Sequence, residues 1–257
     1  MEHPRKEDLV DFGFHKVPEK EKNMRVKRHF DYLANNYDAM NTLMSFGIHY
    51  LWKRAAVRFL DLQTGQSVLD VCGGTGDLSV LAVREVGPSG KVILSDINRI
   101  MVETGRCKTT HGAARKKILR IVSDAELMAL KSDTFDAAMA GFGIRNLVHM
   151  ERGLKEIHRL LKPGGRFVCL EFSRPTSVWF RFLYDFYSFR VMPAVSFVFL
   201  GSREPFTYLP ESIRLFPGPD EFSQFLESVG FRNVTYRMLT NGIAAIHRGD
   251  KMPDVLE

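Results

Sequence analysis

The chain has 257 residues, of which 45% are hydrophobic and 26% charged, so it can bury a full core and is not a disordered protein. The formal net charge of +6 permits an acidic partner, but lysines and arginines are scattered without a run of five, which argues against a nucleic-acid surface. Cys72, Cys107 and Cys169 lie far apart and form no CxxC or Cys/His cluster, so we expect free thiols and no metal site.

Neither a targeting segment nor a membrane span is expected. The first residues, MEHPRKEDLV, contain acids and lack the apolar run of a signal peptide and the Arg-rich composition of a transit peptide. The stretch closest to a membrane span, VMPAVSFVFLG at 191–201, is shorter than the roughly 20 apolar residues required and contains Pro193. We therefore expect a protein of the bacterial cytoplasm or mitochondrial matrix, at most lying peripherally on the inner membrane.

The chain begins with charged residues at 1–22, for which we expect loose order. Apolar residues at helical spacing predict one helix over 23–45 and another over 49–60. Strands and helices then alternate, with GPSG at 87–90 and KPGG at 162–165 as turns. We predict strands at 67–71, 91–95, 117–122, 135–140 and 165–171, and helices at 77–86, 98–110 and 150–161. This order is typical of an α/β fold with a doubly wound, mostly parallel sheet.

Aromatic residues crowd the segment after the fifth strand, and we treat 174–217 as an insertion. A helix at 219–229 follows, and strands at 233–239 and 243–248 complete the sheet as an antiparallel pair. We therefore expect a single domain over 23–257, with a helical extension at 23–60 and this one aromatic insertion.

The segment SVLDVCGGTGDLSVL at 67–81 places Gly73, Gly74 and Gly76 between a strand and a helix, where α/β sheets bind ligands. A dinucleotide fingerprint would need glycine at the position of Ser79, and Asp77 at the helix start would repel a pyrophosphate. A ligand without phosphate is therefore expected at this turn.

S-adenosylmethionine fits this turn because it carries a cationic sulfonium, a cationic amino group and a ribose. Asp70 and Asp77 can meet the amino-acid portion, and Asp96, which ends the second strand, can accept both ribose hydroxyls. Asp124 after the third strand can hold the adenine amino group, with the Ala125 amide beside it. Acids at three neighbouring strand ends thus predict a site for a cationic nucleoside.

Four longer motifs are YDAMNTLMSFGIHYLW at 37–52, FGIRN at 142–146, RLLKPGGRFVCLEFS at 159–173 and YLPESIRLFP at 208–217. They closely resemble the UbiE/MenG family of C-methyltransferases of ubiquinone and menaquinone biosynthesis, over roughly residues 12–249. The resemblance implies a class I methyltransferase fold, S-adenosylmethionine as cofactor and a polyprenylated hydroquinone as substrate. Carried over by motif, the cofactor contacts fall on Thr75, Asp96, Asp124, Ala125 and Gly141. Relatives commonly have alanine at the position of Cys72 and serine or alanine at that of Gly141, so Gly141 can offer only backbone.

Methylation of a ring carbon needs an electron-rich quinol, an aligned methyl group and a destination for protons. We assign Arg145 to polarising a water or stabilising a phenolate, with Asn146 orienting it, which agrees in outline with the water-mediated role that the resemblance implies. His49 either accepts a proton near neutral pH or is a structural histidine hydrogen-bonded near Trp52. Tyr37 and Asp38 either close the N-terminal helix over the cofactor or only pack, and Glu171 is expected to be a structural anchor.

The aromatic insertion either caps a lipophilic substrate tail or packs as ordinary core. Arg174, Arg181 and Arg190 border it and suggest contact with anionic headgroups. Two other functions remain open: another small-molecule O- or N-methyltransferase, and a non-catalytic quinone-binding or scaffold protein. The residues distinguish neither a benzoquinol from a naphthoquinol, nor a monomer from a homodimer or a member of a biosynthetic complex.

Overall fold

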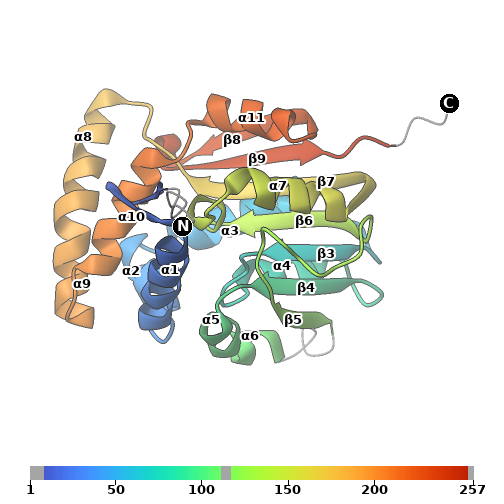
Figure 1. Cartoon of the computed structure of the whole chain (residues 1–257), viewed down its shortest axis with the longest axis horizontal. Helices are drawn as coiled ribbons and strands as arrows, with labels where there is room; N and C mark the ends of the chain where they lie inside the picture. The colour runs from blue at the N-terminus through green and yellow to red at the C-terminus, as the bar shows by residue number, and fades with distance from the viewer. Residues whose placement is uncertain (1–8, 111–116, 254–257) are drawn as a thin grey trace, which may run out of the picture.

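The computed structural model describes residues 9–110 and 117–253, and a seven-stranded sheet lies at its centre (Figure 1). The strands lie in the order β5-β4-β3-β6-β7-β9-β8. Their bounds are β3 Ser67–Val71, β4 Lys91–Asp96, β5 Ile118–Val122, β6 Phe135–Gly141, β7 Leu161–Phe172, β8 Arg232–Leu239 and β9 Ala244–Asp250. Strands β3 to β7 are parallel, while β9 is antiparallel to both β7 and β8. The predicted α/β class and the closing antiparallel pair are confirmed.

Helices cover both faces of the sheet, and a separate apolar core lies between the sheet and the helices on each face. On one face α3 (Ile48–Leu60) and α4 (Asp77–Glu85) bury side chains such as Leu60 and Leu94. On the other, α7 (Met150–Leu160) and α11 (Pro219–Ser228) pack with Phe167 and Phe222. The strand order reverses at β3, whose neighbours are β4 and β6, so the carboxyl ends of these three strands form the ligand-binding edge expected of this topology.

Two predictions about local structure on the sheet are corrected. The helix predicted at 98–110 is divided into α5 (Arg99–Thr104) and α6 (Arg106–Thr110). Between them Gly105 packs so closely on the glycine turn that a Cβ would lie 2.2 Å from the Thr75 carbonyl oxygen. The turn predicted at 162–165 belongs to β7, where the register against β6 shifts and Gly164 takes a positive φ of 78°.

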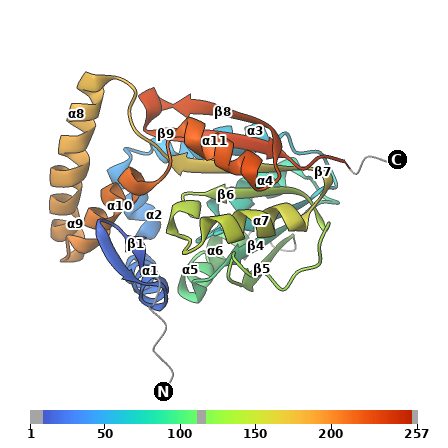
Figure 2. The ribbon, with the colours of Figure 1, turned by 45° about the horizontal axis from the view of Figure 1, so that its top comes forward.

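The expectation of loose order at 1–22 is wrong for residues 9–22, and residues 1–8 lie outside the described part. A hairpin of β1 (Leu9–Phe12) and β2 (His15–Pro18) leads into α1 (Glu19–Leu33). The helix predicted over 23–45 is interrupted after Leu33, and α2 (Tyr37–Met44) starts in a new direction. Both helices lie beside the carboxyl edge of the sheet (Figures 1 and 2).

The aromatic insertion is helical. It consists of α8 (Val178–Phe186), a π-helical segment η3 (Tyr187–Val191), α9 (Met192–Leu200) and α10 (Glu204–Leu215). Figures 1 and 2 show α8 and α9 as one column at the left of the molecule, apart from the sheet. Across the described ranges, none of the helices combines the length and the apolarity that crossing a membrane requires.

Candidate active site

Two adjoining cavities lie between the sheet edge and the N-terminal helices. The first, which we call the strand-end cavity, has a volume of about 240 Å³ and is lined by Gly74, Asp96, Asp124, Ala125 and Gly141 among others. The second, which we call the aromatic cavity, has a volume of about 380 Å³ and lies between α1, α2, α3 and the aromatic insertion. The side chains common to both linings are Phe30, Tyr37 and Phe142. A molecule in one cavity therefore lies next to a molecule in the other.

Asp96 is fixed in the strand-end cavity by two backbone amides. Its carboxylate oxygens accept hydrogen bonds from Gly74 N and Asn98 N, each 2.8 Å long. Burial raises the pKa of Asp96, and the two amide bonds oppose that rise. Asp124 accepts from Glu126 N at 2.9 Å, which orients its carboxyl group at the next strand end. Acceptors at the ends of two strands thus face one cavity, as the sequence predicts.

Strained backbone marks the same cavity. Cys72 and Phe142 follow β3 and β6 directly, both line the cavity, and both have positive φ, 54° and 61°. Such conformations are costly for residues with a Cβ and are retained mostly at functional sites. At Gly141 a Cβ would lie 2.7 Å from Leu78 Cδ1, so an alanine or serine at this position would require a shift of Leu78.

Four residues predicted to contact the cofactor lie outside the cavity lining: Asp70, Gly73, Thr75 and Gly76. Asp70 is fully buried beneath the turn and accepts a hydrogen bond from Ser79 Oγ at 2.6 Å. Desolvation raises the pKa of Asp70 to about 7, although the Ser79 bond lowers it. Thr75 is 3% exposed and donates to Asp38 at 2.9 Å. These residues therefore support the conformation of the glycine turn without lining the cavity.

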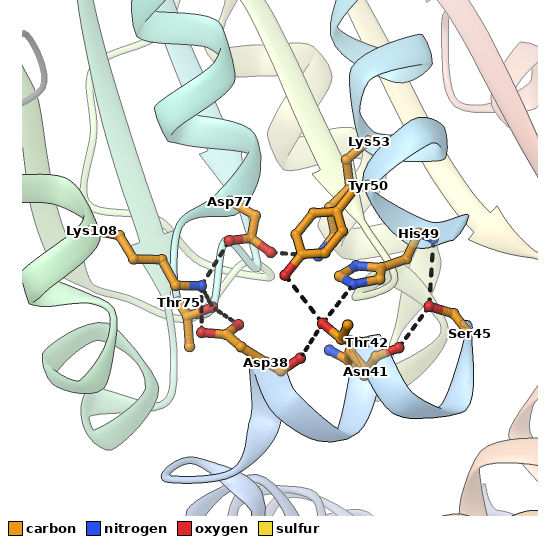
Figure 3. Close-up of polar contacts among 10 residues, drawn as sticks. All are labelled: Asp38, Asn41, Thr42, Ser45, His49, Tyr50, Lys53, Thr75, Asp77 and Lys108. Atoms are coloured by element: carbon orange, nitrogen blue, oxygen red, sulfur yellow. Dashed lines mark hydrogen bonds and ion pairs between the residues drawn. The ribbon is translucent and has the colours of Figure 1, made fainter. Parts of the chain in front are cut away.

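Asp77 was expected to meet the cationic end of the ligand, but two lysines of the chain neutralise it. Its carboxylate accepts from Lys53 at 2.6 Å and from Lys108 at 2.7 Å. Burial by itself would raise the pKa of Asp77, yet the two ammonium groups lower it to about 2. Lys108 also contacts Asp38 and Thr75, so helices α2, α3, α4 and α6 meet at one polar cluster (Figure 3). We call Asp38, Lys53, Thr75, Asp77 and Lys108 the lysine cluster.

A buried ion pair lies beside the aromatic cavity. Arg145 Nη1 donates to Glu171 Oε2 at 2.8 Å, and the Arg145 amide donates to Glu171 Oε1 at 3.2 Å. The guanidinium carbon lies 5.3 Å from the ring centroid of Phe172, and Arg145 Nε has no hydrogen-bond partner within the described chain. Glu171 thus anchors the arginine, as predicted, and one buried donor remains unpaired.

Asn146 is held by α10 instead of holding Arg145. Its side-chain oxygen accepts a hydrogen bond from the Tyr208 hydroxyl at 3.0 Å, and its amide lies 3.5 Å from the Phe142 carbonyl oxygen. Burial raises the pKa of Tyr208 to about 12, so this hydroxyl remains a donor at neutral pH. The predicted contact between Asn146 and Arg145 is therefore replaced by one to Tyr208.

His49 lines the aromatic cavity and is 3% exposed. Its Nε2 lies 3.3 Å from Thr42 Oγ1, whose own hydrogen goes to the Asp38 carbonyl oxygen at 2.8 Å (Figure 3). Because the Thr42 hydrogen goes to Asp38, we assign the imidazole hydrogen to Nε2, which leaves the lone pair on Nδ1. Nδ1 is buried and has no partner in the described structure, and burial with Lys53 nearby lowers the pKa of His49 to about 4. Trp52, near which a structural His49 was expected to be hydrogen-bonded, donates to Thr240 at 2.8 Å.

Sequence reasoning assigned no role to His29 or Tyr208, which both line the aromatic cavity. Their rings lie 5.0 Å apart, and burial together with Arg145 lowers the pKa of His29 to about 4. A signal for His29 existed, because it shares the helical spacing of the buried residues Lys22, Val26 and Leu33. The partner Tyr208 is 179 positions further along the chain and could not be paired with it from the sequence.

The model of the ubiE/COQ5 methyltransferase family matches residues 18–251. The chain belongs to this family. It is 40% identical over 250 residues to "Ubiquinone/menaquinone biosynthesis C-methyltransferase UbiE" of Hydrogenovibrio crunogenus, covering 97% of this chain and 98% of that protein. The protein of the same description from Methylococcus capsulatus is 42% identical over 245 residues, covering 95% and 99%. A solved S-adenosylmethionine-dependent methyltransferase from Thermotoga maritima shares the fold, with a TM-score of 0.60 at 20% identity over 87% of this chain and 98% of that one.

Membership of the ubiE/COQ5 family and the class I fold imply S-adenosylmethionine as the cofactor. The strand-end cavity fits it, because the Asp96 carboxylate is presented at a strand end and glycine lets the turn approach closely. At Gly73 a Cβ would lie 3.0 Å from the Asp70 side chain and 2.9 Å from that of Leu94, so the turn could not take this path with a larger residue. The chain is therefore a methyltransferase, and the strand-end cavity at the carboxyl edge of β3, β4 and β6 has residues that fit its cofactor.

Proposed function

We propose that this chain methylates a ring carbon of a polyprenylated quinol in ubiquinone or menaquinone biosynthesis, with S-adenosylmethionine as methyl donor. The observation that carries the proposal is the shared wall of the two cavities, formed by Phe30, Tyr37 and Phe142. An apolar chamber beside a nucleoside-binding edge suits a lipophilic acceptor better than a small polar amine or alcohol. The two relatives described above, both ubiquinone/menaquinone biosynthesis C-methyltransferases, agree with this substrate class.

In this proposal, Asp96 and Asp124 hold the cofactor, with the Ala125 amide beside its base and the backbone of Gly74 and Gly141 at close approach. The bound cofactor supplies an electrophilic methyl group. Tyr37 and Phe142 separate the two cavities and limit where the quinol ring can lie against that group. Holding the ring carbon in line supplies much of the acceleration, since effective molarities for well-oriented groups are large.

Arg145 stabilises the electron-rich form of the ring in this proposal. A quinol hydroxyl that loses its proton develops negative charge, which the cationic guanidinium of Arg145 can stabilise. Glu171, 1% exposed, fixes the arginine through two hydrogen bonds, so little reorganisation is needed during the reaction. The unpaired Nε hydrogen leaves one donor for a water or an oxygen of the substrate.

His49 accepts the hydrogen bond of a quinol hydroxyl through its bare Nδ1. The low pKa keeps the imidazole neutral above about pH 4, so the lone pair is present throughout the physiological range. A buried acceptor without a partner is costly, and a substrate hydroxyl would satisfy it. The aromatic insertion contributes Phe180, Tyr184 and Tyr187 to the cavity wall and so covers the quinol and the start of its tail.

The decisive experiment incubates the purified protein with methyl-labelled S-adenosylmethionine and a reduced demethylmenaquinol or 6-methoxy-polyprenylbenzoquinol. We expect a labelled product that can be reoxidised to a quinone, because methylation on carbon leaves both hydroxyls free. A labelled product that resists reoxidation would be an O-methyl ether and would favour the alternative methyltransferase. Binding of the cofactor without any transfer would favour the non-catalytic alternative. The pair of substrates also decides which ring the enzyme prefers.

A further inference from the structure

Helix α8 is apolar on two opposite faces, and only one of them faces the rest of the protein. Phe180, Tyr184 and, just after the helix, Tyr187 line the aromatic cavity. Val178, Trp179, Phe182, Leu183 and Phe186 recur at spacings of one and four residues and therefore share a face. Each of these five side chains is between 61% and 80% exposed. A contiguous exposed apolar face usually marks an interaction site, so a covering partner is expected.

The exposed face continues on neighbouring elements. Phe46, in the turn between α2 and α3, is 79% exposed, and its ring lies 6.0 Å from that of Tyr187. In α9, Phe197, Val198 and Phe199 are exposed as well. Leu183 and Phe46 are both exposed and part of the cavity lining, so the surface reaches the rim of the aromatic cavity. We call Phe46 and the five exposed residues of α8 the α8 apolar surface.

The segment of the chain that carries most of this surface is positively charged. Between residues 174 and 203 the chain has four arginines (174, 181, 190 and 203) and one acid, Asp185, which leaves a net charge of +3. All four arginines are exposed, and Asp185 is paired with Arg214. In a symmetric dimer through this face the same positive charges would meet, whereas anionic lipid headgroups complement them.

We propose that the α8 apolar surface binds the interface of an anionic lipid bilayer. Trp179, Phe182 and Phe186 enter the boundary between headgroups and acyl chains, while the bordering arginines contact phosphates, as in interfacial helices. The rim at Leu183 and Phe46 then faces the acyl region, and the lipophilic tail of the substrate passes between bilayer and cavity. This last step depends on the proposed function; the binding of the bilayer does not.

The test uses the full chain with vesicles of phosphatidylcholine alone or mixed with phosphatidylglycerol, without substrate. We expect flotation with the anionic vesicles at low salt and at least tenfold weaker binding with neutral vesicles or with the variant Trp179→Ser/Phe182→Ser/Phe186→Ser. The matched control Leu9→Ser/Leu119→Ser/Met252→Ser removes three exposed apolar side chains elsewhere and should bind as the parent does. The chain has two tryptophans, and Trp52 is 5% exposed, so a blue shift of emission on binding reports Trp179.

Two results would overturn the proposal: absence of flotation and of the blue shift at low salt, or binding that the triple variant of α8 retains. A concentration-dependent dimer that this variant dissociates would instead identify a second copy as the occupant. Methylation of a short-tailed, water-soluble quinol is measured separately, and we expect the α8 variant to retain it. Failure of that reaction in the parent protein would count against the proposed function and leave the vesicle result intact.

Discussion

At the scale of single residues, Asp96 and Arg145 separate cofactor binding from methyl transfer. Asp96→Ala removes a carboxylate at the end of β4 that two backbone amides present to the strand-end cavity. We expect titration calorimetry to show a loss of at least about 100-fold in cofactor affinity, the equivalent of about 3 kcal/mol. Arg145→Gln combined with Glu171→Gln, which avoids an unpaired buried charge, should retain cofactor binding and lower kcat. Equal losses of binding in both variants would contradict this division.

Substitutions of His49 test whether its Nδ1 lone pair accepts a hydrogen bond from the substrate. His49→Asn can place an amide oxygen near the Nδ1 position, whereas His49→Leu removes the acceptor, so we expect the leucine variant to lose about 10²–10³-fold in kcat and the asparagine variant distinctly less. Because the pKa of His49 is about 4, its titration should cause no change of slope in the pH–rate profile near pH 6.5. Burial lowers this pKa most, and the charges of Lys53, Asp77, Asp38 and Lys108 also act on it. Stopped assays from pH 5 to 8 measure both effects. Equal activity of the two variants would exclude a role as acceptor.

Asp70 makes the stability of the fold depend on pH. Its pKa is about 7 in the folded chain against 3.8 in the unfolded one, so between these values the folded state binds one more proton. Stability conferred by the protonated form is therefore lost as the pH rises from about 4 to about 7. Asp70→Asn keeps an acceptor for Ser79 without the charge, and should raise stability at pH 8 by a few kcal/mol at most. Urea unfolding at pH 5 and pH 8 should show the smaller pH dependence in the variant; an unchanged difference would refute it.

At the scale of elements, periodicity predicted the sheet well because each strand is a short apolar run between turn residues. The five parallel strands and the final pair agree with their predicted ranges to within a few residues. Where sequence reasoning failed, distant partners decide the local structure. The β1–β2 hairpin is held by α10, with Phe12 stacked on Tyr208 at 4.4 Å and Phe14 N donating to Glu211. No local pattern in the first 22 residues carries that information.

The residues of the candidate site also fall into two groups: those whose position the sequence predicts, and those whose surroundings depend on distant parts of the chain. Asp96 and Gly141 end strands and Asp124 follows one, so the topology alone brings them together, and the sequence was enough to predict this. Asp77 has the same kind of position, yet its environment contains Lys53 from α3 and Lys108 from α6. The sequence predicts that an acid ends a strand or starts a helix, but not which cations the remaining helices deliver to it.

The lysine cluster joins α2 to the glycine turn, and its loss should loosen α2. Lys108→Met leaves Asp38 without its ion pair, while Lys53 still neutralises Asp77. We expect a several-fold rise in KM for the quinol and faster hydrogen exchange across 37–44, because α2 forms one wall of the aromatic cavity. Lys155→Met removes an exposed ion pair on α7 and serves as the control, since such pairs contribute little. Identical exchange in the two variants would show that the cluster does not hold α2.

At the scale of the whole molecule, the sheet edge forms one side of the strand-end cavity, and the N-terminal helices form the opposite side. Met24, Lys27 and Phe30 of α1 line the strand-end cavity, and Lys22 donates to the Leu147 carbonyl oxygen at 2.7 Å. Asn98, at the end of β4, donates to Asp31 and to the Lys27 carbonyl oxygen. The strand-end cavity is therefore covered by α1, and we expect exchange of a cofactor bound there to require α1 to separate from these contacts.

This arrangement predicts where cofactor binding slows hydrogen exchange. With saturating S-adenosylhomocysteine, we expect protection to increase most in α1 and α2, residues 19–33 and 37–44, because the ligand adds contacts to helices that otherwise rest on a few side chains. The central strands β3 and β6 are already buried and should change little. Mass spectrometry of exchanged peptides, with Asp96→Ala as the control that cannot bind, makes the comparison. Protection confined to the sheet edge, with α1 exchanging as fast as before, would mean that these helices do not close over the cofactor.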